Sequence, residues 1–369
     1  MPPTGPRHQA DLVGQRLLNQ HLAGAPLAGP AEVVRHLGAV QSQDFPGALW
    51  AIAQRCGNPA QSEVAAALTS GAIIRTHVLR PTWHFVAPED LRWMLALTGP
   101  RVMSGSAGRH RELELDAEVF SRSRRALERT LAGGVAATRA EVAAALETAG
   151  IAIDGQRLVH ILLHAEMGGV ICSGPLVGKK QTHVLVEEWV AAAPVLAPDE
   201  AAVELAVRYF SSHGPALVSD FTWWSSLTVA QARRAIDGAA QRLVSVDVGG
   251  RTMWTSPTTP AGRVASPLVR LLPNFDEYVV AYRDRTDFYD PALDPQTLRG
   301  GVMANIVAVD GTAVGNWTRR PKARSVELAV QPWIAFTEAA WDAVETEADR
   351  LGRHLQLPVT LMRGRPTAR

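Results

Sequence analysis

Lysine is nearly absent from this chain of 369 residues: Lys179, Lys180 and Lys322 are the three lysines, and arginine carries the remaining positive charge. Arginine is suited to bidentate contacts with phosphate groups. A GC-rich genome enriches arginine as well, so composition alone does not separate the two causes. The formal net charge of +1 gives no sign of general polyanion binding, and any surface for nucleic acid must therefore be local.

Cysteine is also scarce. Cys56 and Cys172 are the two cysteines in the sequence, and two cysteines do not make the disulfide framework of a small secreted protein. No apolar run reaches the roughly 18–20 residues that a membrane-spanning helix needs, and the N-terminus lacks the apolar core of a signal peptide. We therefore expect a cytoplasmic protein with no membrane partner and with both cysteines buried as small apolar residues.

The common catalytic signatures are missing too. The sequence has no Walker-type phosphate loop, no dinucleotide-binding glycine fingerprint and no Gly-x-Ser-x-Gly elbow. His160 and His164 are four residues apart on a predicted helix and so share a face, but the glutamate of the zinc-protease motif and a third ligand are absent. We interpret the two histidines as a structural pair and expect no metal and no cofactor.

What the sequence does contain is the polar segment Gln41-Ser42-Gln43 between two apolar, helix-like runs. In an extended backbone, side chains two residues apart point the same way, so Gln41 and Gln43 share a space only if the segment is extended. Pro46 favours this, because the residue before a proline avoids the helical region and Pro46 can open the next helix. Asp44 either caps that helix or orients a water molecule.

The order of predicted elements recurs along the chain: short helices are followed by a two-stranded hairpin, which is the pattern of a winged helix. We predict an α+β, mainly helical fold with three tandem winged helix-turn-helix units and a C-terminal mixed region. In chain order these are residues 8–98 (first unit, ending with a helix that closes near Thr98), 99–137 (helical connector), 138–192 (second unit), 199–258 (third unit) and 262–369 (C-terminal hairpin and helix region).

Local signals define several element boundaries. Thr138 and Glu141 have the spacing of a capping box, and Asp199 and Thr337 are expected to be the N-caps of later helices. The pairs Gly249-Gly250 and Asp310-Gly311 predict tight hairpin turns.

Basic residues cluster on the predicted hairpins and second helices. The clusters are Lys179 and Lys180; Arg233 and Arg234; and Arg319, Arg320, Lys322 and Arg324. A winged helix places one helix in a DNA groove and its hairpin against the backbone or the minor groove, where such residues contact phosphates. The alternative is that these side chains are merely solvated, but their placement on comparable elements favours DNA contacts and a concave DNA-binding surface.

Five motifs, in order and spread over nearly the whole chain, resemble those of the AlkZ-type (YcaQ-like) winged-helix DNA glycosylases. They are residues 41–43, 80–86, 223–224, 272–278, and 309–317 with 312–314 left out. The resemblance implies three winged helices around duplex DNA and a catalytic pair, here Gln41 and Gln43. A sister branch has Asp at the second position, so Gln43 assigns this chain to the branch similar to self-resistance enzymes of genotoxin-producing bacteria, which remove bulky N7-alkylguanines. The family's middle residue is usually more apolar than Ser42, which should pack inward.

The implied chemistry suits two uncharged amides. Alkylation at N7 makes guanine a cationic leaving group that needs no strong acid, and the sugar becomes oxocarbenium-like as the bond breaks. Two amides can hold a water molecule through their donor and acceptor atoms, but they are too weakly basic to attack unmodified guanine. No lysine is close to the motif, so we expect a monofunctional reaction. We also expect a monomer that acts on alkylated duplex DNA at the nucleoid. Unhooking of crosslinks stays open.

Two further questions stay open at this point. Trp83 and His84 lie on the first predicted hairpin, near the glutamine pair in sequence, and either support catalysis or form a buried structural pair. The whole chain could instead be a non-catalytic winged-helix DNA-binding protein, such as a transcription regulator, or an interaction scaffold, because a fold does not determine function.

Overall fold

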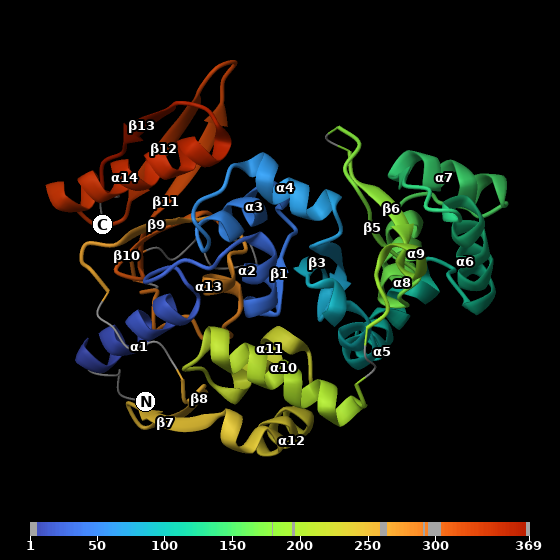
Figure 1. Ribbon diagram of the computed structural model, residues 1–369, viewed down its shortest axis with the longest axis horizontal. Helices are drawn as coiled ribbons and strands as arrows, with labels where there is room; N and C mark the ends of the chain where they lie inside the picture. The colour runs from blue at the N-terminus through green and yellow to red at the C-terminus, as the bar shows by residue number, and fades with distance from the viewer. Residues whose placement is uncertain are drawn as a thin grey trace.

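The computed structural model describes residues 6–178, 180–193, 196–258, 264–290, 292–293 and 304–366. It combines helices with four small antiparallel or mixed sheets. In Figure 1 the first unit lies at the centre, the second unit lies to its right and the third unit lies below it. Most of the C-terminal region lies to the upper left, while its helix α13 reaches the centre. The mixed α and β character agrees with the expectation from the sequence.

The first unit consists of four helices and a three-stranded sheet. Its elements are α1 (Pro6–Asn19), α2 (Pro30–Leu37), β1 (Ala39–Gln41), α3 (Phe45–Ala53), α4 (Gln61–Thr69), β2 (Ile74–Val78) and β3 (Arg80–Val86). The sheet order is β1-β3-β2, so the short strand before the helices pairs with the last strand of the hairpin.

The helix after this hairpin, α5 (Pro88–Glu112), does not end near Thr98, and that prediction is wrong. Pro100 lies inside the helix, where it removes one N–H group at a cost of about 3 kcal/mol. Packing offsets this cost, because Val102 beyond the proline is buried in the same hydrophobic cluster as Met94 before it. The connector then continues as α6 (Ala117–Leu131).

The second and third units repeat the order of the first. The second unit contains β4 (Ala137–Thr138), α7 (Arg139–Thr148), α8 (Arg157–Met167), β5 (Ile171–Ser173), β6 (Thr182–Leu185) and α9 (Val186–Trp189). The third contains α10 (Pro198–His213), α11 (Val218–Ser225), α12 (Val229–Ala239), a 3-10 turn η1 (Ala240–Arg242), β7 (Val244–Val248) and β8 (Arg251–Thr255). Again the segment before the two helices pairs with the last strand, β4 with β6 and Ala216 with Trp254 of β8.

The C-terminal region is built on a five-stranded sheet with the order β13-β12-β11-β10-β9. Its elements are β9 (Val269–Leu272), α13 (Glu277–Val280), β10 (Ile306–Val309), β11 (Thr312–Pro321), β12 (Val326–Pro332), α14 (Glu338–Leu355) and β13 (Val359–Arg363). All strand pairs in this sheet are antiparallel except β12 with β13. These two strands are parallel, and α14 connects them.

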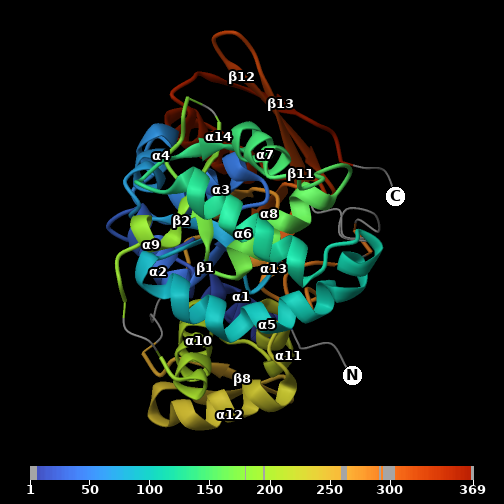
Figure 2. The same cartoon turned by 90° about the vertical axis from the view of Figure 1, so that its right-hand side faces the viewer.

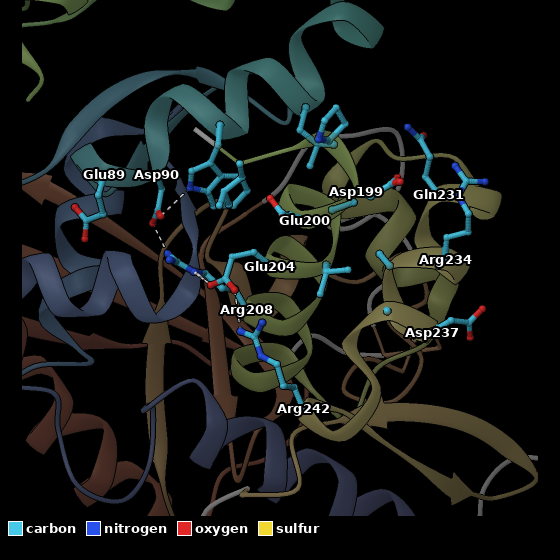
Figure 3. Close-up of a pocket in the computed structure, with 18 residues that line it drawn as sticks. Glu89, Asp90, Asp199, Glu200, Glu204, Arg208, Gln231, Arg234, Asp237 and Arg242 are labelled. Carbon is cyan, nitrogen blue, oxygen red and sulfur yellow. Dashed lines mark hydrogen bonds and ion pairs between the residues drawn. The ribbon is translucent and has the colours of Figure 1, made fainter. Parts of the chain in front are cut away.

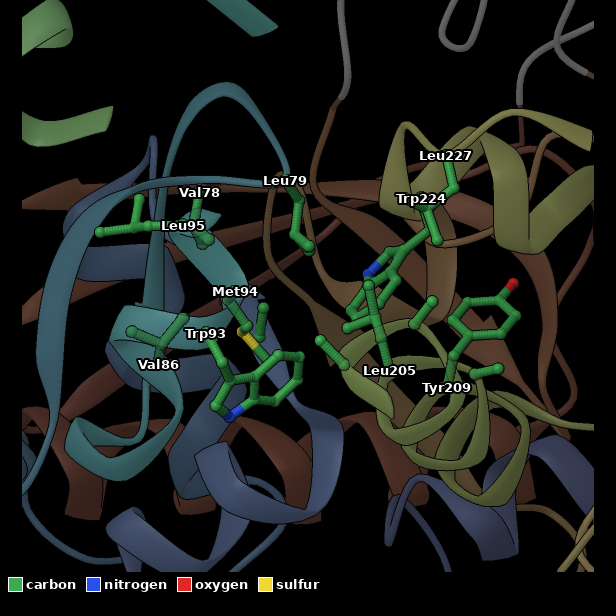
Figure 4. Close-up of a cluster of buried hydrophobic side chains, with 14 of the residues drawn as sticks. Val78, Leu79, Val86, Trp93, Met94, Leu95, Leu205, Tyr209, Trp224 and Leu227 are labelled. Atoms are coloured by element: carbon green, nitrogen blue, oxygen red, sulfur yellow. The ribbon is translucent and has the colours of Figure 1, made fainter. Parts of the chain in front are cut away.

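Two hydrophobic clusters hold the first unit between its neighbours. In one, Leu79 and Met94 pack with Leu205 and Trp224 of the third unit, and Figure 4 shows these side chains meeting between the two units. In the other, apolar side chains of α2 and α3 pack against the C-terminal sheet and α14. The first unit is therefore in contact with residues far along the chain on two sides.

Most local predictions are confirmed. Thr138 and Glu141 form the capping box, Thr337 caps α14, and Gly249-Gly250 and Asp310-Gly311 turn with positive φ. Asp199 is not an N-cap: α10 starts one residue earlier, because Pro198 occupies its first turn and Ala197 takes the cap position.

Cys56 and Cys172 are free and buried, and burial raises the pKa of the Cys56 thiol to about 12. Within the described part of the chain, no helix has the length and apolar character that crossing a membrane requires.

A buried ion pair ties the end of α3 to the C-terminal region and gives a stability prediction. The guanidinium nitrogens of Arg55 lie 2.9 and 2.7 Å from the two carboxylate oxygens of Asp276, and both side chains are at most 1% exposed. Asp276→Asn should lower the free energy of unfolding by about 3 kcal/mol or more, since it leaves a buried cation without its partner.

Urea denaturation measures this loss. Glu128→Gln is the matched control, because its partner Arg124 is 63% exposed and exposed pairs contribute little. Equal effects of the two substitutions would contradict the structural role of the Arg55–Asp276 pair.

Candidate active site at the Gln-Ser-Gln segment

The backbone of the Gln-Ser-Gln segment begins as a strand, as predicted. Gln41 ends β1 opposite His84 of β3, and Ser42 N–H donates to the carbonyl of Trp83 at 2.7 Å. Ser42 is fully buried, which agrees with its expected inward packing. The segment is therefore held along β3 before the chain turns into α3.

The two glutamine side chains contact the same neighbouring strand. Gln41 is 8% exposed, and its Oε1 accepts a long hydrogen bond from Nη2 of Arg80 at 3.4 Å. Gln43 is exposed, and its Oε1 accepts from Trp83 N–H at 3.5 Å. One amide thus lies at the edge of the core and the other in solvent, both beside β3.

Glu277, the first residue of α13, binds the backbone N–H of Gln41. This role was not predicted from the sequence. Its Oε1 accepts from Gln41 N–H at 2.7 Å and its Oε2 accepts from Trp224 Nε1 at 2.9 Å, with His213 Nε2 at 3.6 Å. Burial alone raises the pKa of this carboxyl, but the hydrogen bond and charge of His213 outweigh it, and the pKa lies below its usual value. The signal in the sequence that could have indicated this role is the position of Glu277, a charged residue, within a largely apolar motif.

A second buried carboxylate, Glu166 of α8, reaches the segment through Trp83. Its Oε2 accepts from the backbone N–H of His77 at 2.9 Å, from Nδ1 of His77 at 2.6 Å and from Trp83 Nε1 at 3.2 Å. Burial raises the pKa of Glu166, but the charge and hydrogen bonds of His77 lower it by more. The net shift of the pKa is therefore downward. Glu166 of the second unit thereby fixes Trp83, whose backbone contacts Ser42 and Gln43.

Arg75 of β2 completes this support. Its guanidinium lies over the Trp83 ring, 4.3 Å from the ring centre, and donates to the carbonyl of Ser42 at 3.1 Å. Burial lowers the pKa of Arg75 to about 10, so the side chain stays charged at neutral pH.

The open questions on Asp44 and His84 receive structural answers. Asp44 is the N-cap of α3, because its Oδ1 accepts from Gly47 N–H at 3.2 Å. It also lines a small cavity of about 230 Å³ with Asn274, Asn305 and Asn316. His84 is fully buried, and burial together with the charge of Arg80 lowers its pKa to about 3. At this pKa the His84 ring is neutral at physiological pH.

Most of the predicted DNA contacts are on the surface. Exposed among the described residues are Lys180, Arg233, Arg234, Arg320, Lys322 and Arg324. Arg319 is partly buried, and Lys322 pairs with Glu327 at 3.2 Å. Lys179 lies outside the described residues. Arg320 lies near the tip of the β11–β12 hairpin, and Lys180 lies in the loop between β5 and β6.

A cavity of about 920 Å³ lies between α5, α10 and α12, and its charge is wrong for DNA. Six carboxylates and three arginines line it: Glu89, Asp90, Asp199, Glu200, Glu204 and Asp237, with Arg208, Arg234 and Arg242. Figure 3 shows Arg208 between Asp90 and Glu204, and Arg234 at the opposite rim near Asp199. Arg234 lines the same cavity as these carboxylates, and no residue of the Gln-Ser-Gln segment lines it.

The histidine pair on α8 has a packing role. The ring of His164 stacks on Phe120 with 3.7 Å between ring centres, and His160 meets the ring of His110 edge-on at 5.2 Å. Among the described residues, no group of three or more His, Cys, Asp or Glu side chains has the arrangement to hold a metal ion.

Comparison with known proteins identifies the class of enzyme. A model of the AlkZ-like DNA glycosylases matches residues 34–354. The chain therefore belongs to this family, and the protein is a DNA glycosylase.

Comparisons of sequence and of structure each find a resemblance to a Streptomyces sahachiroi protein over nearly the full length of the chain. The chain is 26% identical to an interstrand DNA cross-link repair glycosylase over 368 residues, which cover 92% of this chain and 94% of that protein. The solved structure of DNA glycosylase AlkZ matches with a TM-score of 0.76 and 23% identity, covering 97% of this chain and 100% of that chain. This second likeness shows the fold.

The buried Glu277 predicts a pH dependence of stability. Its folded-state pKa is below the unfolded value of about 4.3, so the unfolded chain binds the proton first as pH falls. The stabilisation is present above about pH 4.3 and is lost as pH decreases through the lowered folded pKa. Glu277→Gln should be less stable by about 2 kcal/mol at neutral pH, since one of two N–H donors loses its acceptor, and its stability should fall less steeply in acid.

Urea titrations between about pH 3 and pH 7 compare the two proteins. Glu128→Gln, at an exposed carboxylate, should keep the wild-type slope. Identical acid slopes for wild type and Glu277→Gln would show that Glu277 does not carry this linkage.

Proposed function

We propose that the protein is a monofunctional DNA glycosylase that hydrolyses the N-glycosidic bond of bulky N7-alkylguanines, with Gln41 and Gln43 as the catalytic pair. The observation that carries the proposal is the segment itself: Gln41 and Gln43 contact one strand, β3, and Glu277 and Ser42 N–H fix the backbone around them. Rigid backbone support is what a pair of weak catalysts needs, because their contribution comes from positioning.

In this mechanism the amides place a water molecule against the sugar carbon while the cationic base leaves. The amide oxygen accepts from the water and the amide N–H₂ group can donate. His84 is buried and neutral, with a pKa of about 3, so no protonated histidine assists departure of the base from this position. An unmodified guanine is a poor leaving group without an acid, and we propose that the site discriminates against it for this reason.

We propose that the three repeated units are winged helices and that DNA lies against the face to which two hairpins point. In Figures 1 and 2 the β5–β6 loop and the β11–β12 hairpin both project in the same direction past α4. Arg320, Lys322 and Arg324 are exposed at the second of these ends, where they can contact phosphates or enter the minor groove. The acidic cavity at α12 argues that the third unit contributes less to this face.

The lysines are placed for binding, which supports a monofunctional reaction. Lys180 and Lys322 lie on the two hairpin ends, whereas a covalent imine would need an amine at the glutamine pair. We therefore expect an abasic site and free base as products, with the strand left intact. The name of the S. sahachiroi relative, an interstrand DNA cross-link repair glycosylase, makes unhooking of crosslinks and self-resistance to a genotoxin the biological role that we propose.

Single substitutions test the catalytic pair. Gln41→Ala and Gln43→Ala should each reduce release of N7-alkylguanine from duplex DNA by at least about tenfold, equivalent to about 1.4 kcal/mol of transition-state stabilisation. Affinity for the same duplex should stay within a few-fold, because neither glutamine carries charge. Single-turnover base release and fluorescence anisotropy measure the two quantities.

Gln241→Ala is the matched control, since Gln241 is exposed on η1 of the third unit, and it should excise at the wild-type rate. Normal excision by both catalytic-pair variants would refute the assignment. Tight binding by the wild type without excision, over a panel of adducts, would favour the transcription-regulator alternative.

A further inference from the structure

Arg80 stands beside the glutamine pair without a carboxylate partner. It is the first residue of β3, and its one hydrogen bond within the described residues is the 3.4 Å contact from Nη2 to Gln41 Oε1. Its Nε is buried with no partner there, and no described carboxylate lies within 4.0 Å of its guanidinium. An arginine has five N–H donors, so most of the donor capacity of Arg80 is unused.

The neighbouring carboxylate is already occupied. Both oxygens of Glu277 accept hydrogen bonds, from Gln41 N–H and from Trp224 Nε1. Burial lowers the pKa of Arg80, although the charge of Glu277 opposes the shift. A partly buried cation without an ion pair is costly, and the fold retains this cost next to the proposed catalytic amide.

A second arginine, Arg285, interacts electrostatically with Arg80. Its Nε donates to the carbonyl of Val279 at 3.0 Å, and this contact leaves its terminal guanidinium nitrogens free for another ligand. Burial is the main cause that lowers the pKa of Arg285, and the positive charge of Arg80 lowers it further. A second positive charge of this kind favours an anion at Arg80.

We propose that Arg80 binds a backbone phosphate of the DNA strand that carries the damaged nucleotide. This proposal rests on the proposed function of the Gln-Ser-Gln segment and adds the binding site that sets its register on DNA. A phosphodiester matches the arginine fork in charge and geometry. Because Arg80 also contacts Gln41 Oε1, the bound phosphate and the catalytic amide share one anchoring side chain.

The arrangement also has an electrostatic consequence for catalysis. An unpaired guanidinium next to a sugar that becomes cationic opposes bond breaking by charge repulsion. A phosphodiester bound to Arg80 compensates that charge, because its single negative charge is shared by its two non-bridging oxygens. The site therefore becomes suited to glycosidic hydrolysis when the strand is correctly seated, and phosphate binding acts on the rate as well as on the affinity.

The test uses duplexes in which one phosphate at a time is replaced by an uncharged methylphosphonate, at linkages on both sides of a stable abasic-site analogue. Wild-type affinity should fall about tenfold for one linkage close to the analogue. Arg80→Met should bind the unmodified duplex about tenfold more weakly, with the salt slope of log K reduced by about one, and should lose no more affinity at that linkage. Arg80→Lys should restore part of the binding.

Two controls separate this role from folding. Arg124→Met removes an exposed arginine of α6 that pairs with Glu128 and should keep the wild-type methylphosphonate profile. Arg75→Met removes a buried arginine with structural contacts and should lower Tm, whereas Arg80→Met should leave Tm unchanged or raise it, because it removes an unpaired buried charge.

Binding is measured without catalysis, so the result stands apart from the glycosylase mechanism. If Gln41→Ala and Gln43→Ala excise normally while Arg80→Met loses sensitivity at one linkage, the catalytic pair is wrong and the phosphate site is right. If Arg80→Met keeps the wild-type methylphosphonate profile, or if its Tm falls as far as that of Arg75→Met, the phosphate site is refuted.

Discussion

The hydrogen bond from Gln41 N–H to the buried carboxylate of Glu277 is the contact on which the rest of the site depends. It joins residues 236 positions apart in sequence and fixes the backbone of β1 at its last residue. Glu277 also binds Trp224 of the third unit, so one carboxylate connects three parts of the chain. A buried ion that accepts charge-assisted hydrogen bonds is stable in one geometry, and this geometry determines where the Gln41 side chain begins.

A second carboxylate acts from the opposite side. Glu166 belongs to the second unit, but its hydrogen bonds end on His77 and Trp83 of the first unit, and the Trp83 backbone contacts the Gln-Ser-Gln segment. The first unit alone therefore does not supply the rigid segment. The backbone around Gln41 and Gln43 is thus supported by Glu277 of the C-terminal region and, through Trp83, by Glu166 of the second unit. This support requires these parts of the protein to be packed together.

Much of the local structure could be predicted because its causes are local. The extended Gln41, the capping box at Thr138 and the turn at Gly249-Gly250 follow from backbone preferences of nearby residues. Glu277 and Glu166 could not be predicted, since their partners lie far away in sequence, and a charged residue in an apolar stretch does not name its partner. The continuation of α5 through Pro100 has the same origin, because tertiary packing outweighed a local breaking signal.

The charges around the glutamine pair divide into two groups with different consequences. Glu277, Glu166 and Arg75 are bound to protein donors, acceptors or rings, so their charges hold the fold and change little when DNA binds. Among the described residues, Arg80 has no carboxylate partner, and its hydrogen bond goes to Gln41 Oε1. In our proposal, a phosphate of the DNA backbone supplies the missing partner at the position where the two uncharged amides are aligned. An enzyme of this kind, without a strong acid or base, draws on the DNA backbone itself to complete the electrostatics of its site.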